Sequence, residues 1–182
     1  MPRLTVFTGS STGHDPVHRR AADQLGAALA RRGVALVYGG GHVGLMGVLA
    51  DAVLRAGGVV HGVMPQHLVD REDAHPRLTT LEVVEDMHAR KRRMAELGDG
   101  FLALPGGVGT LEELVEIWTW QHLGLHAKPV GLLDVAGFWR PLLALADHMV
   151  EAGFLTRDRR EGLWTGEDVE PLLDLLEEAD RG

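Results

Sequence analysis

Residues 101–113 read FLALPGGVGTLEE, and this stretch decides the fold. Its first four residues form a continuous apolar run of strand length, which is typical of a strand buried on both faces of a parallel sheet. The Pro-Gly-Gly that follows ends such a strand, and the apolar spacing of residues 110–123 predicts a helix. The stretch therefore predicts a strand, a glycine-rich turn and a helix in immediate succession.

The same succession recurs on both sides of this stretch. Short apolar runs predict strands at residues 4–8, 34–38, 59–64, 81–84, 101–104 and 129–133. The helical spacing of apolar residues predicts helices at residues 17–32, 44–56, 87–97, 110–123, 139–151 and 168–179. Because strands alternate with helices, we expect an α/β fold: a Rossmann-like three-layer sandwich, with a mostly parallel sheet and helices on both faces.

Length and composition narrow the class further. A chain of 182 residues suits one domain, which we expect to span residues 1–182. Hydrophobic residues make up 45% and charged residues 24% of the chain, which excludes a disordered protein. The net charge of −8 argues against nucleic-acid binding, because that affinity comes mainly from Lys and Arg that neutralise phosphates. The absence of cysteine excludes disulfides, thiolate metal sites and cysteine nucleophiles.

The apolar runs of the chain are all short. None approaches the ~18 residues that a membrane span needs. The run at residues 4–8 is also too short for the apolar region of a signal peptide. We therefore expect a cytoplasmic protein that has no membrane partner.

Three glycine clusters follow predicted strands. They are residues 8–13 (TGSSTG), 39–47 (GGGHVGLMG) and 105–110 (PGGVGT). In parallel sheets, ligands bind beyond the carboxyl ends of the strands, which is where these clusters fall. Glycine lets the backbone approach a ligand closely, and the N–H groups of the helix that follows face an anion. One cluster is as well explained by a tight turn, but three in one sheet favour a ligand that carries a phosphate.

The glycine spacing does not fit the two commonest phosphate-binding motifs. A dinucleotide fold needs G-x-G-x-x-G after its first strand and an acidic residue about 20 positions later. The first cluster lacks this pattern, and the strand after the second cluster ends in GVM, at residues 62–64, without an acid. No glycine is followed by lysine, as a P-loop requires. Neither NAD nor ATP bound in the Walker manner is therefore expected.

The string PGGVGTLEE at residues 105–113 resembles the signature of the Lonely Guy (LOG) family, the cytokinin riboside 5′-monophosphate phosphoribohydrolases. Older members of this family carry the label lysine decarboxylase. Residues 39–47, 63–65 (VMP), 87–91 (MHARK) and 6–13 (VFTGSSTG) also match the family pattern. The resemblance implies a single domain that binds a nucleoside monophosphate. It also implies hydrolysis of the N-glycosidic bond of an N6-modified AMP to free base and ribose 5-phosphate, without a cofactor or a metal.

The resemblance also assigns residues. Arg90 of MHARK and Glu113 of PGGVGTLEE would be the catalytic pair. The remaining matches would contact the nucleotide, and the glycine-rich loop would hold its 5′-phosphate. These substrate-binding residues are Gly9, Ser10, Gly40, Gly41, Glu72, Met87, Lys91, Gly106, Gly107, Val108, Gly109, Thr110, Leu111 and Glu112.

The chemistry of the reaction suits the catalytic pair. Cleavage of an N-glycoside builds positive charge on the ribose, which a carboxylate near C1′ stabilises, or the carboxylate activates the attacking water. Glu113 can act in this way. Arg90 holds its proton too tightly to be a general acid, so we interpret it as an electrostatic stabiliser of the leaving base.

Structural explanations compete with these roles. Thr110 and Glu113 have the T-x-x-E spacing of a capping box, in which Thr110 would be the N-cap of a helix. Glu112 and Glu116, four residues apart, would form a solvated helix edge equally well. The basic run at residues 90–93 resembles a solvated helix face, although Arg90 lies next to the apolar positions of that helix.

Other functions remain open as well. Relatives with this fold resemble molybdenum-cofactor carriers, which would bind a phosphate-bearing ligand without catalysis. A broader hydrolase of AMP or another nucleoside monophosphate is the second alternative. The resemblance further implies a homodimer or a larger homo-oligomer with a shared active site. The histidine pairs 14/18 and 122/126 have metal-ligand spacing, but neither completes H-E-x-x-H, so we expect a structural role for them.

Overall fold

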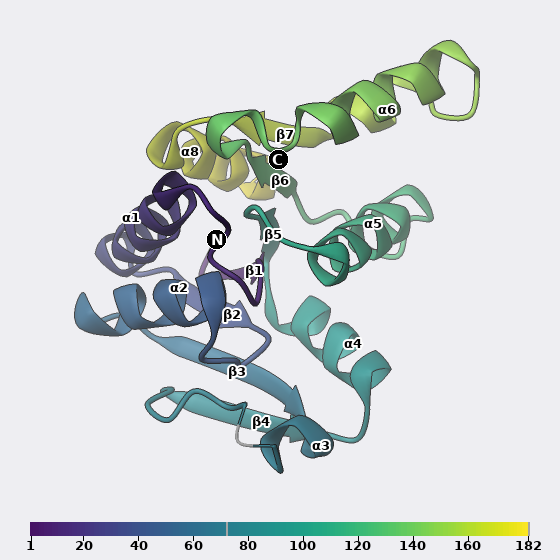
Figure 1. Ribbon diagram of the computed structural model, residues 1–182. Helices are drawn as coiled ribbons and strands as arrows, with labels where there is room; N and C mark the ends of the chain where they lie inside the picture. Colours follow the sequence, from purple (N-terminus) through teal and green to yellow (C-terminus); the bar gives the residue numbers. More distant parts are fainter. Residues whose placement is uncertain (72, 182) are drawn as a thin grey trace.

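The computed structural model describes residues 1–71 and 73–181, and a seven-stranded sheet forms its centre (Figure 1). The strands are β1 (Arg3–Phe7), β2 (Ala35–Tyr38), β3 (Val60–Pro65), β4 (Thr80–Val84), β5 (Gly100–Ala103), β6 (Val130–Leu133) and β7 (Leu163–Gly166). The helices are α1 (Pro16–Arg32), α2 (Gly44–Arg55), α3 (Gln66–Val69), α4 (Met87–Leu97), α5 (Val108–His122), α6 (Arg140–Glu151), α7 (Arg157–Glu161) and α8 (Val169–Arg181), with a 3-10 turn η1 (Val135–Gly137).

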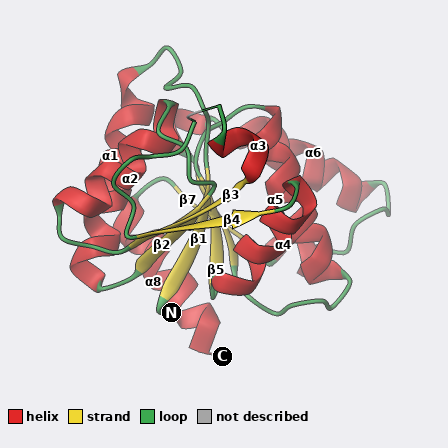
Figure 2. Ribbon diagram, turned by 90° about the horizontal axis from the view of Figure 1, so that it is seen from below, coloured by secondary structure: helices red, strands yellow, loops and turns green. Residues whose placement is uncertain are grey.

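All neighbouring strands run parallel, in the order β4-β3-β2-β1-β5-β6-β7. Helices α1, α2 and α8 cover one face, and α4, α5 and α6 cover the other (Figure 2). This three-layer arrangement confirms the predicted α/β class. In the described part of the chain, no helix is both long enough and apolar enough to cross a membrane.

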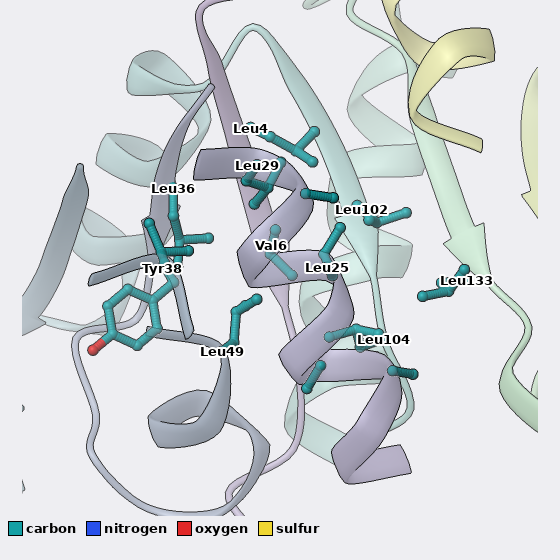
Figure 3. Close-up of a cluster of buried hydrophobic side chains, with 14 of the residues drawn as sticks. Leu4, Val6, Leu25, Leu29, Leu36, Tyr38, Leu49, Leu102, Leu104 and Leu133 are labelled. Carbon is teal, nitrogen blue, oxygen red and sulfur yellow. The ribbon is translucent and has the colours of Figure 1, made fainter. Parts of the chain in front are cut away.

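Two apolar cores hold the layers together, one on each face of the sheet. On the first face, Leu25 and Leu29 of α1 pack against the leucines of the central strands, such as Leu4 and Leu36 (Figure 3). These side chains are excluded from solvent. Burial of one leucine contributes about 1.5–3 kcal/mol, so the alternation of apolar strands and amphipathic helices specifies the stack.

The predicted elements lie where the apolar patterns put them. All six predicted strands and all six predicted helices are present, and their ends differ from the prediction by at most two residues. The sequence did not predict α3, α7, η1 or β7. The last of these is a four-residue edge strand, LWTG, and α7 (RDRRE) has no apolar residue that could show a helical period.

The strand order reverses direction at β1. This strand pairs with β2 on one side and with β5 on the other, so the chain winds outward both ways from the centre. The loops after β1 and β5 therefore leave the sheet side by side, and the Gly9 N–H donates a hydrogen bond to the Pro105 carbonyl (3.2 Å). Ligands of open α/β sheets bind at such a switch point.

The connection from β6 to α6 turns through an unusual backbone conformation. Ala136 has a φ of 54°, in the left-handed region that favours glycine, and Gly137 follows with a φ of 75°. The buried carboxylate of Asp134 accepts a hydrogen bond from the Trp139 N–H (2.6 Å) and so closes the turn. A residue other than glycine is thus held in a strained conformation by the surrounding structure.

Candidate active site

A cavity of about 410 Å³ lies at the carboxyl ends of the central strands. The loops after β1 and β2 and the first turns of α5 form part of its wall, and α4 and the segment between α3 and β4 close it. Its charged lining residues are Arg71, Asp73, Arg90, Glu112 and Glu113. The two residues that the sequence assigned to catalysis, Arg90 and Glu113, therefore face one cavity at the switch point.

Arg90 lies in the first turns of α4, which begins behind the N-cap Asp86. Its Nε donates to the Val63 carbonyl (3.1 Å) and its Nη2 donates to the Gly39 carbonyl (3.0 Å). The guanidinium can take this position only because residue 39 is glycine, since a Cβ there would lie 1.6 Å from Nη2. Burial lowers the pKa of the guanidinium, and Glu113 opposes that shift. Arg90 is thus a fixed cation at the cavity wall.

Glu113 approaches the cavity from α5 and is partly buried. Burial raises the pKa of its carboxyl group to about 7, although the cations Arg90 and Lys91 lower it. The carboxylates of Glu112 and Glu116 add to the increase. Within residues 1–71 and 73–181, no salt bridge of 4.0 Å or less joins Arg90 to Glu113. The two groups therefore remain available to a ligand between them, and the carboxyl group changes its charge near neutral pH.

The start of α5 overturns the capping-box explanation. The helix begins at Val108 with Gly107 as its N-cap, two residues earlier than predicted, so Thr110 lies inside the first turn. The Leu111 N–H donates to the Gly107 carbonyl (3.1 Å), which leaves the N–H groups before it at the open end of the helix. A Cβ on Gly106 would lie 2.1 Å from the Thr110 Oγ1, so only glycine lets the loop pack here. The capping box is wrong, and the helix end can bind an anion.

Lys91 forms ion pairs with Glu112 and Glu116, although the Glu112 side chain is still 53% exposed. The Lys91 Nζ lies 2.5 Å from Glu112 Oε1 and 3.1 Å from Glu116 Oε2. Burial lowers the pKa of Lys91, but its hydrogen bonds with both carboxylates raise it more. Lys91 is not among the residues that line the described cavity, whereas Glu112 is. In the structure, Lys91 therefore pairs with two carboxylates. The resemblance had assigned it a contact with the nucleotide.

The apolar part of the cavity wall is rich in methionine. The side chains that form it come from the loop after β2, from α2, from the end of β3, and from α3 and α4. They are Val43, Met46, Met64, Leu68 and Met87. Methionine adapts its shape readily, so this wall suits an apolar group of irregular outline.

A second cavity of about 290 Å³ adjoins the first. Ser10 lines both, and the second is formed by the loops after β1 and β5 together with His18 and Phe138. The substrate-binding residues predicted in the three glycine clusters are therefore divided between the two cavities. Gly9, Gly106 and Gly107 line the second cavity, and Gly41, Gly109 and Thr110 line the first.

Four predicted contacts are not among the residues that line these cavities. Gly40, Lys91, Val108 and Leu111 line neither of these two cavities. Val108 is 84% exposed, and the Gly40 carbonyl accepts a hydrogen bond from the His75 N–H (2.8 Å). Glu72 lies outside the described residues. Its neighbours Arg71 and Asp73 both line the first cavity.

Three residues of the cavity wall lie outside every motif that the sequence offered: Leu68, Arg71 and Asp73. They belong to the connection between β3 and β4, which carries no apolar period and no motif. The backbone brings them in, because the His42 N–H donates to the Asp73 carbonyl (3.3 Å). An isolated bridge between Gly41 and Ala74 fixes the same approach.

The paired histidines pack with aromatic and backbone groups. His18 meets Phe138 edge-on, with ring centroids 6.0 Å apart, and the His126 Nε2 lies 3.0 Å from the Ile117 carbonyl oxygen. Across residues 1–71 and 73–181, no three His, Asp or Glu side chains gather as a metal site would require. The cavity's own groups are carboxylates, a guanidinium and hydroxyls, which suit the binding of a phosphorylated sugar.

Comparison with known proteins gives a consistent result. The family described as "Possible lysine decarboxylase" matches residues 46–176. A cytokinin riboside 5′-monophosphate phosphoribohydrolase of Rhodococcoides fascians is 49% identical, over 92% of this chain and 85% of its own length. One from Arabidopsis thaliana is 47% identical, over 97% of this chain and 81% of its own length.

Solved structures share the fold at much lower identity. The molybdenum cofactor carrier protein of Chlamydomonas reinhardtii superimposes with a TM-score of 0.75 at 20% identity, and 100% of this chain and 99% of that chain are covered. The molybdenum cofactor binding protein of Rippkaea orientalis gives 0.73 at 22% identity, with 97% and 96% covered. At this identity the likeness concerns the fold alone.

Proposed function

The chain belongs to the family of the cytokinin riboside 5′-monophosphate phosphoribohydrolases, and from this membership we propose that it hydrolyses the N-glycosidic bond of an N6-modified adenosine 5′-monophosphate. The products are the free base and ribose 5-phosphate. The observation that carries the proposal is the placement of Arg90 and Glu113, from two different helices, on the wall of one cavity. The open N-terminus of α5 adjoins them.

The roles of these groups follow from the charges that the reaction creates. The 5′-phosphate binds at the N-terminus of α5, where backbone N–H groups and the helix dipole favour an anion. The ionised carboxylate of Glu113 then stabilises the positive charge on the ribose or takes a proton from the attacking water. Arg90 stabilises the negative charge that develops on the leaving base, and the base takes its proton from water. Two bonds to backbone carbonyls fix Arg90 before substrate arrives.

The base occupies the methionine-rich part of the cavity. An apolar N6 substituent would displace water from Met46, Met64 and Met87, which is favourable in proportion to the apolar area buried. Plain AMP would leave this wall in contact with water. The wall therefore supports a preference for N6-modified AMP over the broader AMP hydrolase that the sequence left open.

The family label of lysine decarboxylase does not suit this cavity. Decarboxylation of an amino acid needs an electron sink, which is commonly held by a lysine Schiff base. The chain has two lysines: Lys91 is paired with carboxylates, and the Lys128 Nζ donates to the Ala95 carbonyl (2.7 Å). Neither lines the cavity.

Exposed apolar side chains support a homodimer with a shared site. Val108, Leu111 and Val115 are exposed on α5, on the same helix as Glu113. Leu145 and Met149 are exposed on α6, which covers the same face of the sheet. A second copy that covers these residues would shield apolar surface on α6 and on α5, the helix that carries Glu113. Light scattering after size-exclusion chromatography would give a dimer or larger assembly, and a monomer at micromolar concentration would contradict this.

The proposal is tested by incubating the protein with isopentenyladenosine 5′-monophosphate and with AMP, and by following release of free base by chromatography. We expect release from the modified nucleotide to exceed that from AMP, and Glu113→Gln to reduce it by about 10²–10⁴-fold. Glu178→Gln makes the same chemical change on the exposed surface of α8 and serves as the control. If neither nucleotide releases base but both raise the melting temperature, the protein binds nucleotides without catalysis, as a carrier would.

A further inference from the structure

Three charged side chains join the two helices that carry the catalytic pair. Lys91 of α4 lies within 2.5 Å of Glu112 and 3.1 Å of Glu116, both on α5. The Lys91 side chain is only 10% exposed, so its aliphatic stem is covered by neighbouring residues and its ammonium group lies against the two carboxylates. The Glu116 side chain is 25% exposed and the Glu112 side chain 53% exposed, so opening the cluster would leave mainly the charges of Lys91 and Glu116 without a partner away from water.

The positions of these residues along the helices are informative. Lys91 directly follows Arg90, and Glu112 directly precedes Glu113. On each helix, the residue that forms the ion pair is therefore the immediate neighbour of the catalytic residue. Arg90 instead donates to the β2 and β3 side of the cavity, through Gly39 and Val63. The arrangement fixes the two helices together and leaves Arg90 and Glu113 free to face a substrate.

We propose that Lys91 is a positioning residue: its ion pairs with Glu112 and Glu116 hold α4 and α5 at the spacing that places Arg90 and Glu113 on either side of the substrate. The proposal rests on the function proposed above for this cavity. It replaces the expectation that Lys91 contacts the nucleotide.

The same cluster also modifies the pKa of Glu113, which is raised chiefly by burial. The charged groups around its carboxyl are Arg90 and Lys91 from α4 and Glu112 and Glu116 from α5, and Arg71 and Asp73 line the same cavity from the α3–β4 connection. Lys91 lowers the pKa of Glu113, whereas Glu112 and Glu116 raise it. Removing the cation and removing a carboxylate of the cluster must therefore shift the pKa in opposite directions. Loosened packing alone would not produce opposite signs.

The first experiment measures this directly. The ¹³C signal of the Glu113 carboxyl, assigned with Glu113→Gln, is titrated in the wild-type protein, in Lys91→Met and in Glu116→Gln. We expect a higher pKa in Lys91→Met and a lower pKa in Glu116→Gln. Arg93→Gln is the matched control, because Arg93 lies on α4 but pairs with Glu82 and Glu96 instead of with α5. Shifts of the same sign in both variants, or none in Lys91→Met, would overturn the proposal.

The second experiment separates positioning from nucleotide binding. We expect Lys91→Met to lower kcat by about 10- to 100-fold, because small displacements of reacting groups are costly, while the Kd for AMP measured by calorimetry changes less than about threefold. Lys91→Arg, which can still reach both carboxylates, should restore most of kcat. A Kd that weakens by about tenfold or more with kcat retained would make Lys91 a nucleotide ligand and contradict the inference.

The two proposals fail in different ways. If the wild-type protein releases no base, the proposed function fails, while the carboxyl titration still decides the role of the cluster. If Lys91→Met does not fold, Glu116→Gln and Lys91→Arg still report the sign of the pKa shift and the effect of keeping the cation. An unchanged pKa of Glu113 in Glu116→Gln would then contradict the proposal that the charges of this cluster act on Glu113.

Discussion

Gly39 and Arg90 depend on each other. The guanidinium donates to the Gly39 carbonyl and occupies the space where any other residue at position 39 would place its Cβ. The second glycine cluster therefore does more than form a tight turn. It provides one of the two backbone carbonyls that bind the Arg90 guanidinium, and both carbonyls lie near the carboxyl ends of neighbouring strands.

We expect Gly39→Ala to abolish most activity. The new Cβ would lie 1.6 Å from the Arg90 Nη2, so the guanidinium must leave its seat. Loss of a preorganised charge at the reacting centre costs about 10²–10³-fold in kcat. The measurement is base release at saturating substrate. Gly162→Ala is the control, because a Cβ there makes only ordinary contacts, 3.4 Å or more from its neighbours. Activity within threefold of the wild type in Gly39→Ala would show that Arg90 acts from another position.

The pH dependence of the reaction should report Glu113. Burial raises the pKa of this carboxyl group to about 7, and the ionised form is the one that stabilises the ribose cation. We therefore expect kcat/KM to rise with pH and to level off above about 7. A profile that falls through this range would instead make the protonated form active, with Glu113 as the proton donor to the base.

Secondary structure was predictable at the level of elements because the apolar periods are strong. The strand at residues 101–104 and the helix at residues 87–97 were recognisable from short runs and from spacing alone, and the helix bounds match those of α4. The start of α5 was misplaced, because Gly107 caps the helix through its backbone and the sequence offered Thr110 as a more familiar cap.

Only those residues of the candidate site that lie shortly after a strand in the sequence could be predicted. The glycine loops identified Gly41, Gly109 and Thr110, since parallel strands bring their carboxyl ends together. Arg71 and Asp73 could not be found in this way. They reach the cavity through backbone hydrogen bonds of the α3–β4 connection, and such bonds leave no pattern of residue types.

The turn between β6 and α6 should accept glycine with a gain in stability. Ala136 has a φ of 54°, and the left-handed conformation costs about 1–2 kcal/mol in a residue with a Cβ. Glycine loses about 0.5–1 kcal/mol more in conformational entropy on folding, so the net gain of Ala136→Gly is about 0.5–1 kcal/mol. Urea unfolding measures it. Ala152→Gly, at a φ of −78°, is the control and should not be stabilised. A loss of stability in Ala136→Gly would mean that the Cβ is needed for packing.

Stability of the whole molecule is linked to the charge of Glu113. The pKa of its carboxyl is about 7 in the folded protein against 4.5 for an ordinary glutamate, so ionisation destabilises the folded state. The favourable contribution of the protonated form is complete below pH 4.5 and is lost as the pH rises through about 7. The ionised carboxylate on the cavity wall therefore destabilises the folded protein by about 3 kcal/mol at pH 8.

We expect Glu113→Gln to be more stable than the wild type at pH 8 and equally stable at pH 4. The amide resembles the protonated carboxyl group and has no charge to bury. The difference in the free energy of unfolding, measured with urea at both pH values, should reach about 3 kcal/mol at pH 8. Glu178→Gln should show no such dependence, because Glu178 is exposed. An equal difference at both pH values would point to packing rather than to charge.

The position of β1 at the centre of the sheet also bears on synthesis of the chain. Leu4 pairs with Leu36 on one side and with Gly100 on the other. At about 5–20 residues per second, a ribosome takes roughly 5–20 s to make the residues between Leu4 and Gly100. During that time β1 has an unpaired edge, which can join strands of other chains. The cavity closes only when β5 and α5 arrive, so a nascent chain that binds nucleotide has already completed the middle of its sheet.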